Sequence, residues 1–152
     1  MKTLTLLLSA FLWTSCTLLQ PPPEPIKREP VTAPDAPAPI GPYSQAIKIG
    51  NSLYCSGQIG IDPATGDLVI GDVRAETRQA LNNLGAVLRA AGMGYGDVVK
   101  ATVFLSDLND YKIVNEIYAE FFNATKPARE AVQVARLPRD AKVEISCIAV
   151  KL

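Results

Sequence analysis

A segment near the C-terminus constrains the fold most, because an apolar side chain occurs at every second position along it and polar side chains lie between the first of these. In residues 142–150 every second side chain is apolar, and Lys142, Glu144 and Ser146 lie between them. A period of two is typical of a β-strand that buries one face. A carboxylate inside a mostly apolar sheet costs free energy unless it is exposed, paired or used. The chain therefore builds a sheet with a covered face, and Glu144 becomes a candidate functional residue.

Two amphipathic segments can cover that sheet. Residues 72–91 carry apolar side chains at helical spacing and end at Gly92 and Gly94, which favour a helix stop. Asp110 can cap a second helix, whose apolar face is formed by Val114, Ile117, Tyr118, Phe121 and Phe122. Both predicted helices are about long enough to lie across one face of a sheet.

Strands are predicted at four further places: 46–49, 52–56, 98–105 and 131–137. The first two flank Gly50–Asn51, a two-residue hairpin turn, and a turn at 138–140 joins the last to 142–150. This order predicts an α+β fold with a single sheet and two helices on one face. Because both faces of the strands carry apolar residues, the face without helices is expected to meet other subunits.

Histidine is absent, and 15 basic side chains balance 15 acidic ones. The absence of histidine excludes Ser-His-Asp and Cys-His catalysis and the usual histidine-containing metal sites, so no metal is expected. A net charge of zero argues against a nucleic-acid partner, because such binding depends on clustered lysine and arginine. Acid–base chemistry must then use Glu, Asp, Tyr, Lys or bound water.

The three cysteines, Cys16, Cys55 and Cys147, are too few and too dispersed for a zinc site or a disulfide scaffold. Cys55 and Cys147 fall in apolar strands and are interpreted as small buried hydrophobic side chains. A disulfide between these two remains open if the compartment is oxidising.

The N-terminus predicts export. Residues 1–16 combine one lysine, an apolar run and small residues before Cys16, as in a bacterial lipoprotein signal, although Trp13 departs from that pattern. We expect Cys16 to be acylated and to anchor the protein in the periplasm or cell envelope; an uncleaved anchor or an ordinary signal cut elsewhere is the alternative. Residues 17–37 are proline-rich and predict an extended tether, which leaves 38–152 as the folded domain.

Three sequence segments resemble those of a known family: IGPYSQAIKIGNSLYCSGQIGIDPATGDL at 40–68, AGMGYGDVVKATVFLSDLNDYKIVNEIYAEFF at 91–122 and KPAREAVQVARLPRDAKVEISCIAV at 126–150. Together they closely resemble the RidA/YjgF family of enamine/imine deaminases over essentially all of 38–152. The resemblance implies a chorismate-mutase-like fold and a homotrimer whose sheets form a central β-barrel, with active sites in clefts between subunits.

The resemblance also implies a reaction and its residues. The reaction is the hydrolysis of 2-aminoacrylate and other short 2-imino acids to 2-oxo acids and ammonia, of the 2-iminobutanoate/2-iminopropanoate deaminase type, without a cofactor. Arg129 would bind the substrate carboxylate, Glu144 would activate water, and Tyr43 would close the pocket. The remaining substrate-binding positions are Ser56, Gly57, Asn115 and Ala131. Ala131 stands where the family commonly has cysteine, which excludes thiol chemistry there.

Other interpretations stay open. Without the resemblance, Arg129 reads as a solvated loop cation and Glu144 as a solvent-facing strand residue. The protein could be a non-catalytic, small-carboxylate-binding or chaperone-like trimer in the cell envelope. The ribonuclease activity attributed to some relatives fits poorly with balanced charge and no histidine. Familiar family members work in the cytosol, so an exported copy needs an imine source that the sequence does not name.

Overall fold

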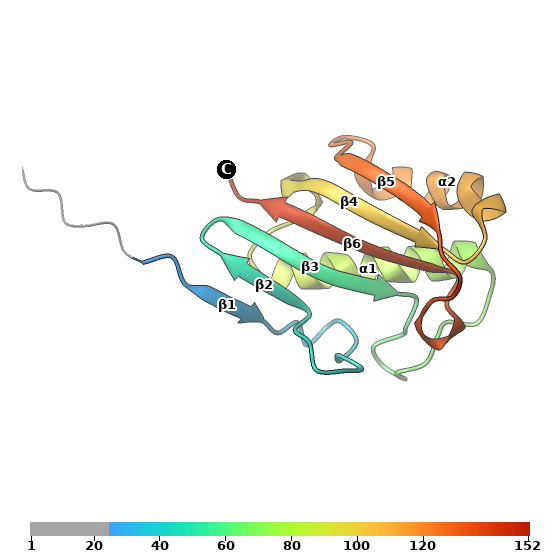
Figure 1. The fold of residues 1–152 in the computed structure, drawn as a ribbon, viewed down its shortest axis with the longest axis horizontal. Helices are drawn as coiled ribbons and strands as arrows, with labels where there is room; N and C mark the ends of the chain where they lie inside the picture. Colours follow the sequence, from blue (N-terminus) through green and yellow to red (C-terminus); the bar gives the residue numbers. More distant parts are fainter. Residues whose placement is uncertain (1–24) are drawn as a thin grey trace, which may run out of the picture.

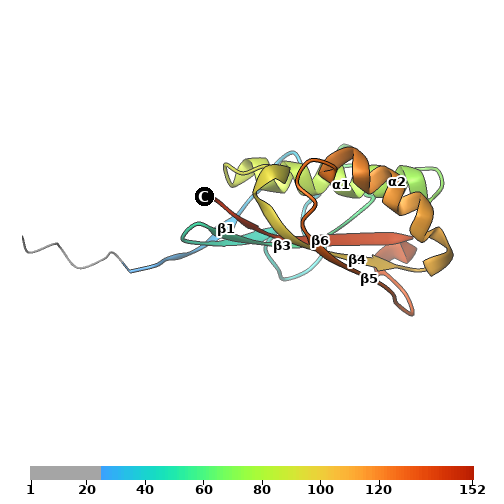
Figure 2. The same ribbon diagram turned by 90° about the horizontal axis from the view of Figure 1, so that it is seen from above.

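The computed structural model describes residues 25–152, so the predicted signal and Cys16 lie outside the described residues. Two helices lie on one face of a six-stranded sheet (Figures 1 and 2), and the α+β prediction is confirmed. The helices are α1 (Val73–Ala90) and α2 (Tyr111–Phe122). The strands are β1 (Arg28–Val31), β2 (Ala46–Ile49), β3 (Ser52–Ile59), β4 (Val98–Leu105), β5 (Ala128–Gln133) and β6 (Val143–Val150).

The sheet order is β1-β2-β3-β6-β4-β5. All neighbouring strands are antiparallel except β4 and β5, which run parallel and are connected through α2. The predicted hairpin is confirmed, since Ile49 pairs with Ser52 across Gly50–Asn51.

The prediction for residues 131–137 is wrong in position and partner. The strand is β5, which begins three residues and ends four residues earlier, and the turn at 138–140 does not fold it back onto β6. Instead β4 lies between β5 and β6. The physical reason is the β4–α2–β5 connection, because a helix between two strands allows them to pair in parallel. As a result β5 becomes an edge strand.

The tether predicted for residues 17–37 is wrong in its last part. Strand β1 pairs with β2 at the sheet edge, where Pro30 is tolerated because an edge strand leaves one side of its backbone unpaired. Ala33 and Ala36 are buried. The Gln45 side chain holds the same segment: its Oε1 accepts from the Ala33 N–H at 2.7 Å, and its Nε2 donates to the Ala33 carbonyl at 3.0 Å. The folded unit therefore begins before residue 38.

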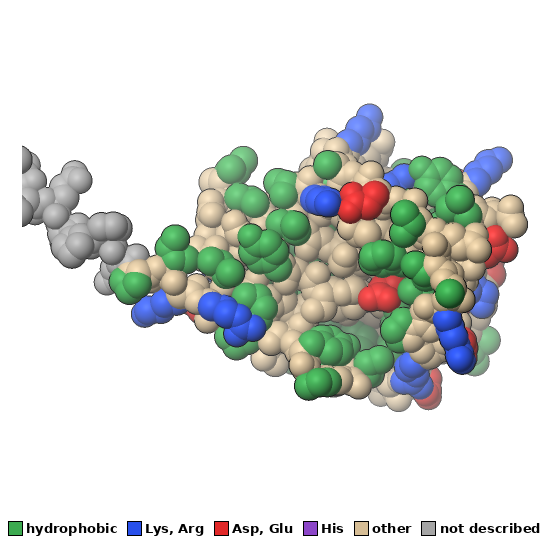
Figure 3. Space-filling view, in the orientation of Figure 1, with side chains coloured by type: hydrophobic (Ala, Val, Ile, Leu, Met, Phe, Trp, Pro, Cys, Tyr) green, Lys and Arg blue, Asp and Glu red, His purple; other side chains and the backbone are tan. Residues whose placement is uncertain are grey.

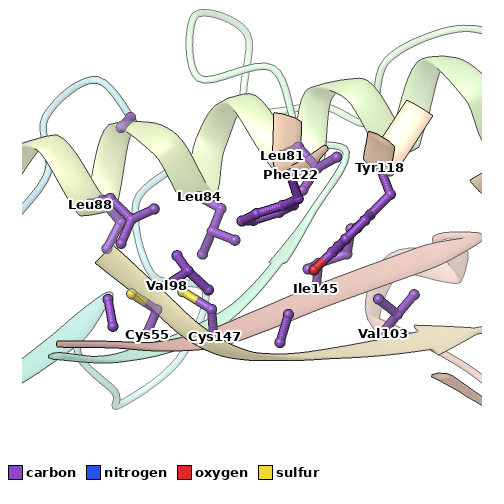
Figure 4. Packing of buried hydrophobic residues seen from close by; sticks show 14 of the residues in the cluster. Cys55, Leu81, Leu84, Leu88, Val98, Val103, Tyr118, Phe122, Ile145 and Cys147 are labelled. Atoms are coloured by element: carbon purple, nitrogen blue, oxygen red, sulfur yellow. The ribbon is translucent and has the colours of Figure 1, made fainter. Parts of the chain in front are cut away.

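The core fills the space between the helices and the sheet (Figure 4). Leu81, Leu84 and Leu88 of α1 are fully buried. Along β6 buried and half-buried residues alternate without a break, which confirms the sequence pattern. Asp72 caps α1 by accepting from two backbone N–H groups, whereas the Asp110 side chain makes no capping hydrogen bond to α2, contrary to expectation.

The other face of the sheet carries no helix. Tyr54 is 48% exposed and Val132 is 43% exposed on this face. The space-filling view shows hydrophobic side chains spread over it (Figure 3). The expectation that this face meets other subunits stays a prediction. Within residues 25–152, none of the helices has the length and apolar character needed to cross a bilayer.

Candidate active site

Arg129 lies on the edge strand β5, in register with Ala101 of β4. Its guanidinium carbon is 4.6 Å from the ring centroid of Tyr118 and 5.7 Å from that of Tyr111, both on α2. These are cation–π distances. The Arg129 Nη2 also donates a hydrogen bond of 3.2 Å to the Tyr111 hydroxyl. The aromatic rings therefore fix the guanidinium, and none of the ion pairs formed among residues 25–152 includes Arg129.

A pocket of about 470 Å³ lies beside this guanidinium, and Asn115, Tyr118 and Arg129 contribute to its wall. The pKa of Tyr111 is lowered, first by a hydrogen bond with Asn115 and then by the positive charge of Arg129. We call Arg129, Asn115, Tyr111 and Tyr118 the arginine cluster. Such a cationic, aromatic-walled pocket suits a small carboxylate, because the planar fork of arginine can donate two parallel hydrogen bonds.

Glu144 belongs to a second group. It lies on β6 between Phe104 of β4 and Ile59 of β3. It borders a pocket of about 410 Å³ that is also lined by Tyr43, Ser56 and Gly57. We call Glu144, Tyr43, Ser56 and Gly57 the glutamate cluster. Desolvation raises the pKa of Glu144 above its ordinary value. A raised pKa means that this carboxyl holds its proton up to a higher pH, which favours its use as both acceptor and donor of a proton.

The absence of a side chain at Gly57 leaves room for the carboxylate of Glu144. A Cβ atom on Gly57 would overlap the carboxylate of Glu144, so a larger residue there would displace that side chain. The register between β3 and β6 shifts between Cys55 and Gln58, which places a bulge at this point. A bulge next to a candidate site is a common way to redirect a side chain.

Ser56 and Tyr43 shape the rim of the same pocket. The Ser56 hydroxyl donates to the carbonyl of Ser44 at 2.7 Å and so holds the loop that carries Tyr43. Only its lone pairs remain for a ligand. The Tyr43 hydroxyl accepts from the backbone N–H of Ile40 at 3.2 Å, and the side chain is exposed at the pocket mouth.

The two clusters lie on opposite faces of the sheet. Arg129 shares its face with Ala101, which is buried under the helices, whereas Glu144 shares its face with Phe104 on the uncovered side. Ala131 follows Arg129 on the helix side and packs against the core. One chain therefore holds two halves of the predicted site and does not bring them together.

Sequence reasoning missed the contacts of Tyr111 and Tyr118 with Arg129. The signal was present, since Tyr111, Asn115 and Tyr118 are spaced i, i+4, i+7 and form one stripe of α2. Tyr118 was interpreted only as part of the apolar face of the helix. Its burial is confirmed, but its ring also supports the guanidinium. Across residues 25–152, His, Cys, Asp and Glu side chains form no group of three that could hold a metal ion.

The family model for endoribonuclease L-PSP matches residues 33–151. The chain belongs to this family. A mouse protein named 2-iminobutanoate/2-iminopropanoate deaminase is 52% identical to this chain over 126 residues, which cover 83% of this chain and 93% of the mouse protein.

Two solved structures are also similar to this chain. The YjgF gene product of E. coli is 50% identical with a TM-score of 0.78, over 82% of this chain and 99% of that one. E. coli TdcF with bound serine is 43% identical with a TM-score of 0.77, over 82% and 99% of the two chains. The RidA/YjgF resemblance found in the sequence is thereby confirmed.

Proposed function

We propose that the protein hydrolyses short 2-imino acids, 2-aminoacrylate among them, to 2-oxo acids and ammonia. The observation that carries the proposal is Arg129, whose guanidinium is held by two tyrosine rings at the wall of a pocket. Glu144 supplies the second requirement, a partly desolvated carboxylate in a separate pocket. The deaminase name of the mouse relative supports the same reaction.

The complete site is a cleft between two copies of the chain. One copy supplies the arginine cluster at its β5 edge, and the next supplies the glutamate cluster on its uncovered sheet face. The exposed Tyr54 and Val132 of that face support such an assembly, because apolar side chains on a sheet are stabilised by a partner. In a homotrimer, each copy supplies its arginine cluster to one neighbour and its glutamate cluster to the other, so that three equal interfaces close into a ring. The three sheets then surround a central barrel.

The reaction requires that the substrate binds, that one water molecule attacks it, and that both protons of this water reach the imine nitrogen. Arg129 grips the substrate carboxylate and places C2 of the imine in the cleft. Glu144 takes a proton from water as its oxygen attacks C2, which gives a carbinolamine. The protonated Glu144 returns this proton to the nitrogen and then transfers the hydroxyl proton of the carbinolamine to the same nitrogen, so the C–N bond breaks as the C=O bond forms, and ammonia leaves with the 2-oxo acid. Proton-transfer help of this kind typically contributes about 10²–10⁴-fold.

The remaining residues shape the cleft. Tyr43 at the pocket mouth closes over the substrate, and Ser56 holds the loop of Tyr43 and offers lone pairs to the imine nitrogen. Asn115 orients Tyr111, which in turn holds Arg129. The backbone of Ala131 continues the arginine side of the cleft.

The proposed location is the periplasm or cell envelope, with a lipid on Cys16 as the anchor. Its support is the sequence of residues 1–16. The imine would then come from enzymes that oxidise or eliminate from amino acids outside the cytosol. Fatty-acid labelling tests the anchor: the wild-type chain is expected to take up the label and a Cys16→Ala chain to lose it, whereas label on both would contradict an anchor at Cys16.

The activity test uses imines generated in place by an amino-acid oxidase, with ammonia release followed over time. We expect the protein to accelerate release, and Arg129→Ala to lower kcat/KM by about 100-fold or more, since two charge-assisted hydrogen bonds are lost. Arg78→Ala is the matched control, because Arg78 only pairs with Glu120 on the helix surface. Equal rates with and without protein would contradict the proposal.

The same preparation tests the other functions. A trimer that binds pyruvate or prevents aggregation of a client, without imine hydrolysis, would favour a non-catalytic module, and the exposed apolar sheet face is its support. The family description names an endoribonuclease. RNA cleavage that persists through stringent purification would support that activity, although the chain offers no histidine and no net positive charge for it.

A further inference from the structure

Two of the three cysteines lie directly opposite each other in the middle of the sheet. Cys55 of β3 pairs in register with Cys147 of β6, and the two strands are antiparallel. Both residues are buried free thiols in this structure. Their sulfur atoms lie close together on the helix side of the sheet (Figure 4). This arrangement is independent of the two clusters assigned to imine hydrolysis.

The register brings the pair within the range of a covalent bond. Directly opposed residues of antiparallel strands have Cα atoms about 4.5–5.5 Å apart. A disulfide spans Cα separations of about 4.4–6.8 Å and Cβ separations of about 3.5–4.5 Å. Opposed Cβ atoms in such strands are about 4.5–5.5 Å apart, so the strands need to close by only about 1 Å.

The thiol of Cys147 is neutral at rest. A hydrogen bond that the Cys147 thiol donates to Cys55, together with burial, raises the pKa of Cys147 far above its ordinary value. A buried neutral thiol is a poor nucleophile, because the thiolate is the reactive form. The pair is therefore unsuited to catalysis, and bond formation belongs to folding or to transient opening of the sheet.

We propose that Cys55 and Cys147 form an intramolecular disulfide when the protein folds in the presence of a disulfide-donating oxidant. One thiolate attacks the donor disulfide and forms a mixed disulfide, releasing one donor thiol. The second thiolate displaces the other donor thiol and closes the Cys55–Cys147 bond. Two thiols of the protein are oxidised, the donor disulfide is reduced to two thiols, and the protons pass to these leaving groups.

The disulfide would covalently link the two strands that carry Ser56, Gly57 and Glu144 of the glutamate cluster. Cys55 directly precedes Ser56 and the bulge at Gly57, and Cys147 is three residues from Glu144 on the same strand. The closed loop contains α1, β4, α2 and β5. A loop of this size restricts the unfolded chain strongly, so the linkage should stabilise the fold.

The test follows the thiols of the full chain after refolding with glutathione disulfide. Alkylation under denaturing conditions, digestion and mass spectrometry are expected to give one linked pair of peptides carrying Cys55 and Cys147. Cys16→Ser is the control that should keep this linkage. Two fully alkylated cysteines, or glutathione attached to either one without a link, would overturn the proposal.

A second measurement separates linkage from packing. Adding dithiothreitol should lower the thermal midpoint of the oxidised wild-type protein by about 5 °C or more. The Cys55→Ala and Cys147→Ala variants cannot form the link, so the same reductant should leave their midpoints unchanged. A reductant effect of equal size in wild type and variants would also overturn the proposal.

Discussion

Arg129 and Glu144 point to opposite faces of one sheet, with Arg129 under α2 and Glu144 on the side without helices. If they act on one substrate, they must come from different copies of the chain. Arg129→Ala and Glu144→Gln should therefore each lose most of their activity alone and regain part of it when unfolded together and refolded as a mixture. Random mixing in a closed ring gives about one quarter of the clefts both wild-type groups.

This complementation is measured as ammonia release per subunit, against the unmixed variants refolded in the same way. Activity that stays at the level of the two parents would place both groups of each site in one chain. A mixture of Arg129→Ala with Arg129→Ala/Glu144→Gln is the control, because it restores no complete cleft.

The activity of the protein should fall on the acid side as Glu144 becomes protonated. Desolvation raises the pKa of Glu144 in the free protein above 4.5, so the acid limb of the kcat/KM profile is expected above that value. The Glu144→Gln variant should lose the limb together with most of its activity. A limb at or below pH 4.5 would show that another group titrates.

The free energy of unfolding should also depend on pH through the protonation of Glu144, and the raised pKa determines the direction of this dependence. A raised pKa in the folded state means that the protonated carboxyl is favoured on folding, so this contribution is present at low pH and is lost as pH rises through the raised pKa. Glu144→Gln should therefore be more stable than wild type near pH 7, and the difference should disappear below pH 4.5. Urea unfolding at the two pH values measures this. A constant difference would contradict the assigned cause.

Gly57→Ala should remove activity more than it removes stability. The new methyl group would occupy the place of the Glu144 carboxylate, and the side chain would have to swing out of its pocket. We expect kcat to fall by about 100-fold, since acid–base help of about 10²–10⁴-fold depends on the position of this carboxylate. Gly96→Ala is the control, because its added methyl would meet no atom within 4 Å. Equal kcat values in the two variants would contradict the close packing of Gly57 on Glu144.

The ring of Tyr118, not its hydroxyl, should matter for substrate binding. Tyr118→Leu removes a cation–π contact worth about 0.5–2 kcal/mol and should raise KM several-fold. Tyr118→Phe keeps the ring, and it removes a buried hydroxyl that has no hydrogen-bond partner among the described residues. Its free energy of unfolding should stay equal or rise by about 1 kcal/mol. A KM for Tyr118→Phe as high as that of Tyr118→Leu would assign the hydroxyl a role.

The sequence predicted the parts of the fold that depend on local pattern. Strand β6 follows from the apolar residue at every second position, and α1 from its apolar spacing and from Gly92 and Gly94 after its last turn. Strand β1 was missed because prolines usually exclude strands, and Pro30 is accepted only since it lies at an edge. The position of β5 depends on pairing with β4 through a crossover, which no local pattern encodes.

The candidate site also combines features that the sequence predicts with features that depend on tertiary structure. Arg129 and Glu144 could be singled out by residue type and by resemblance, but their opposite orientation depends on the register of both strands with β4. The support of Arg129 by Tyr111 and Tyr118 depends on how α2 lies over the sheet edge. Such packing relationships follow from tertiary structure.

Strands β1 and β5 form the two outer edges of the sheet. A bead, electrode or fluorescent carrier coupled before Arg28 would thus be attached at the sheet edge formed by β1. In the order of the strands, this edge is the one furthest from Arg129. Immobilisation through that end should leave the arginine pocket open to diffusing metabolites, whereas coupling through lysines near β5 would obstruct it.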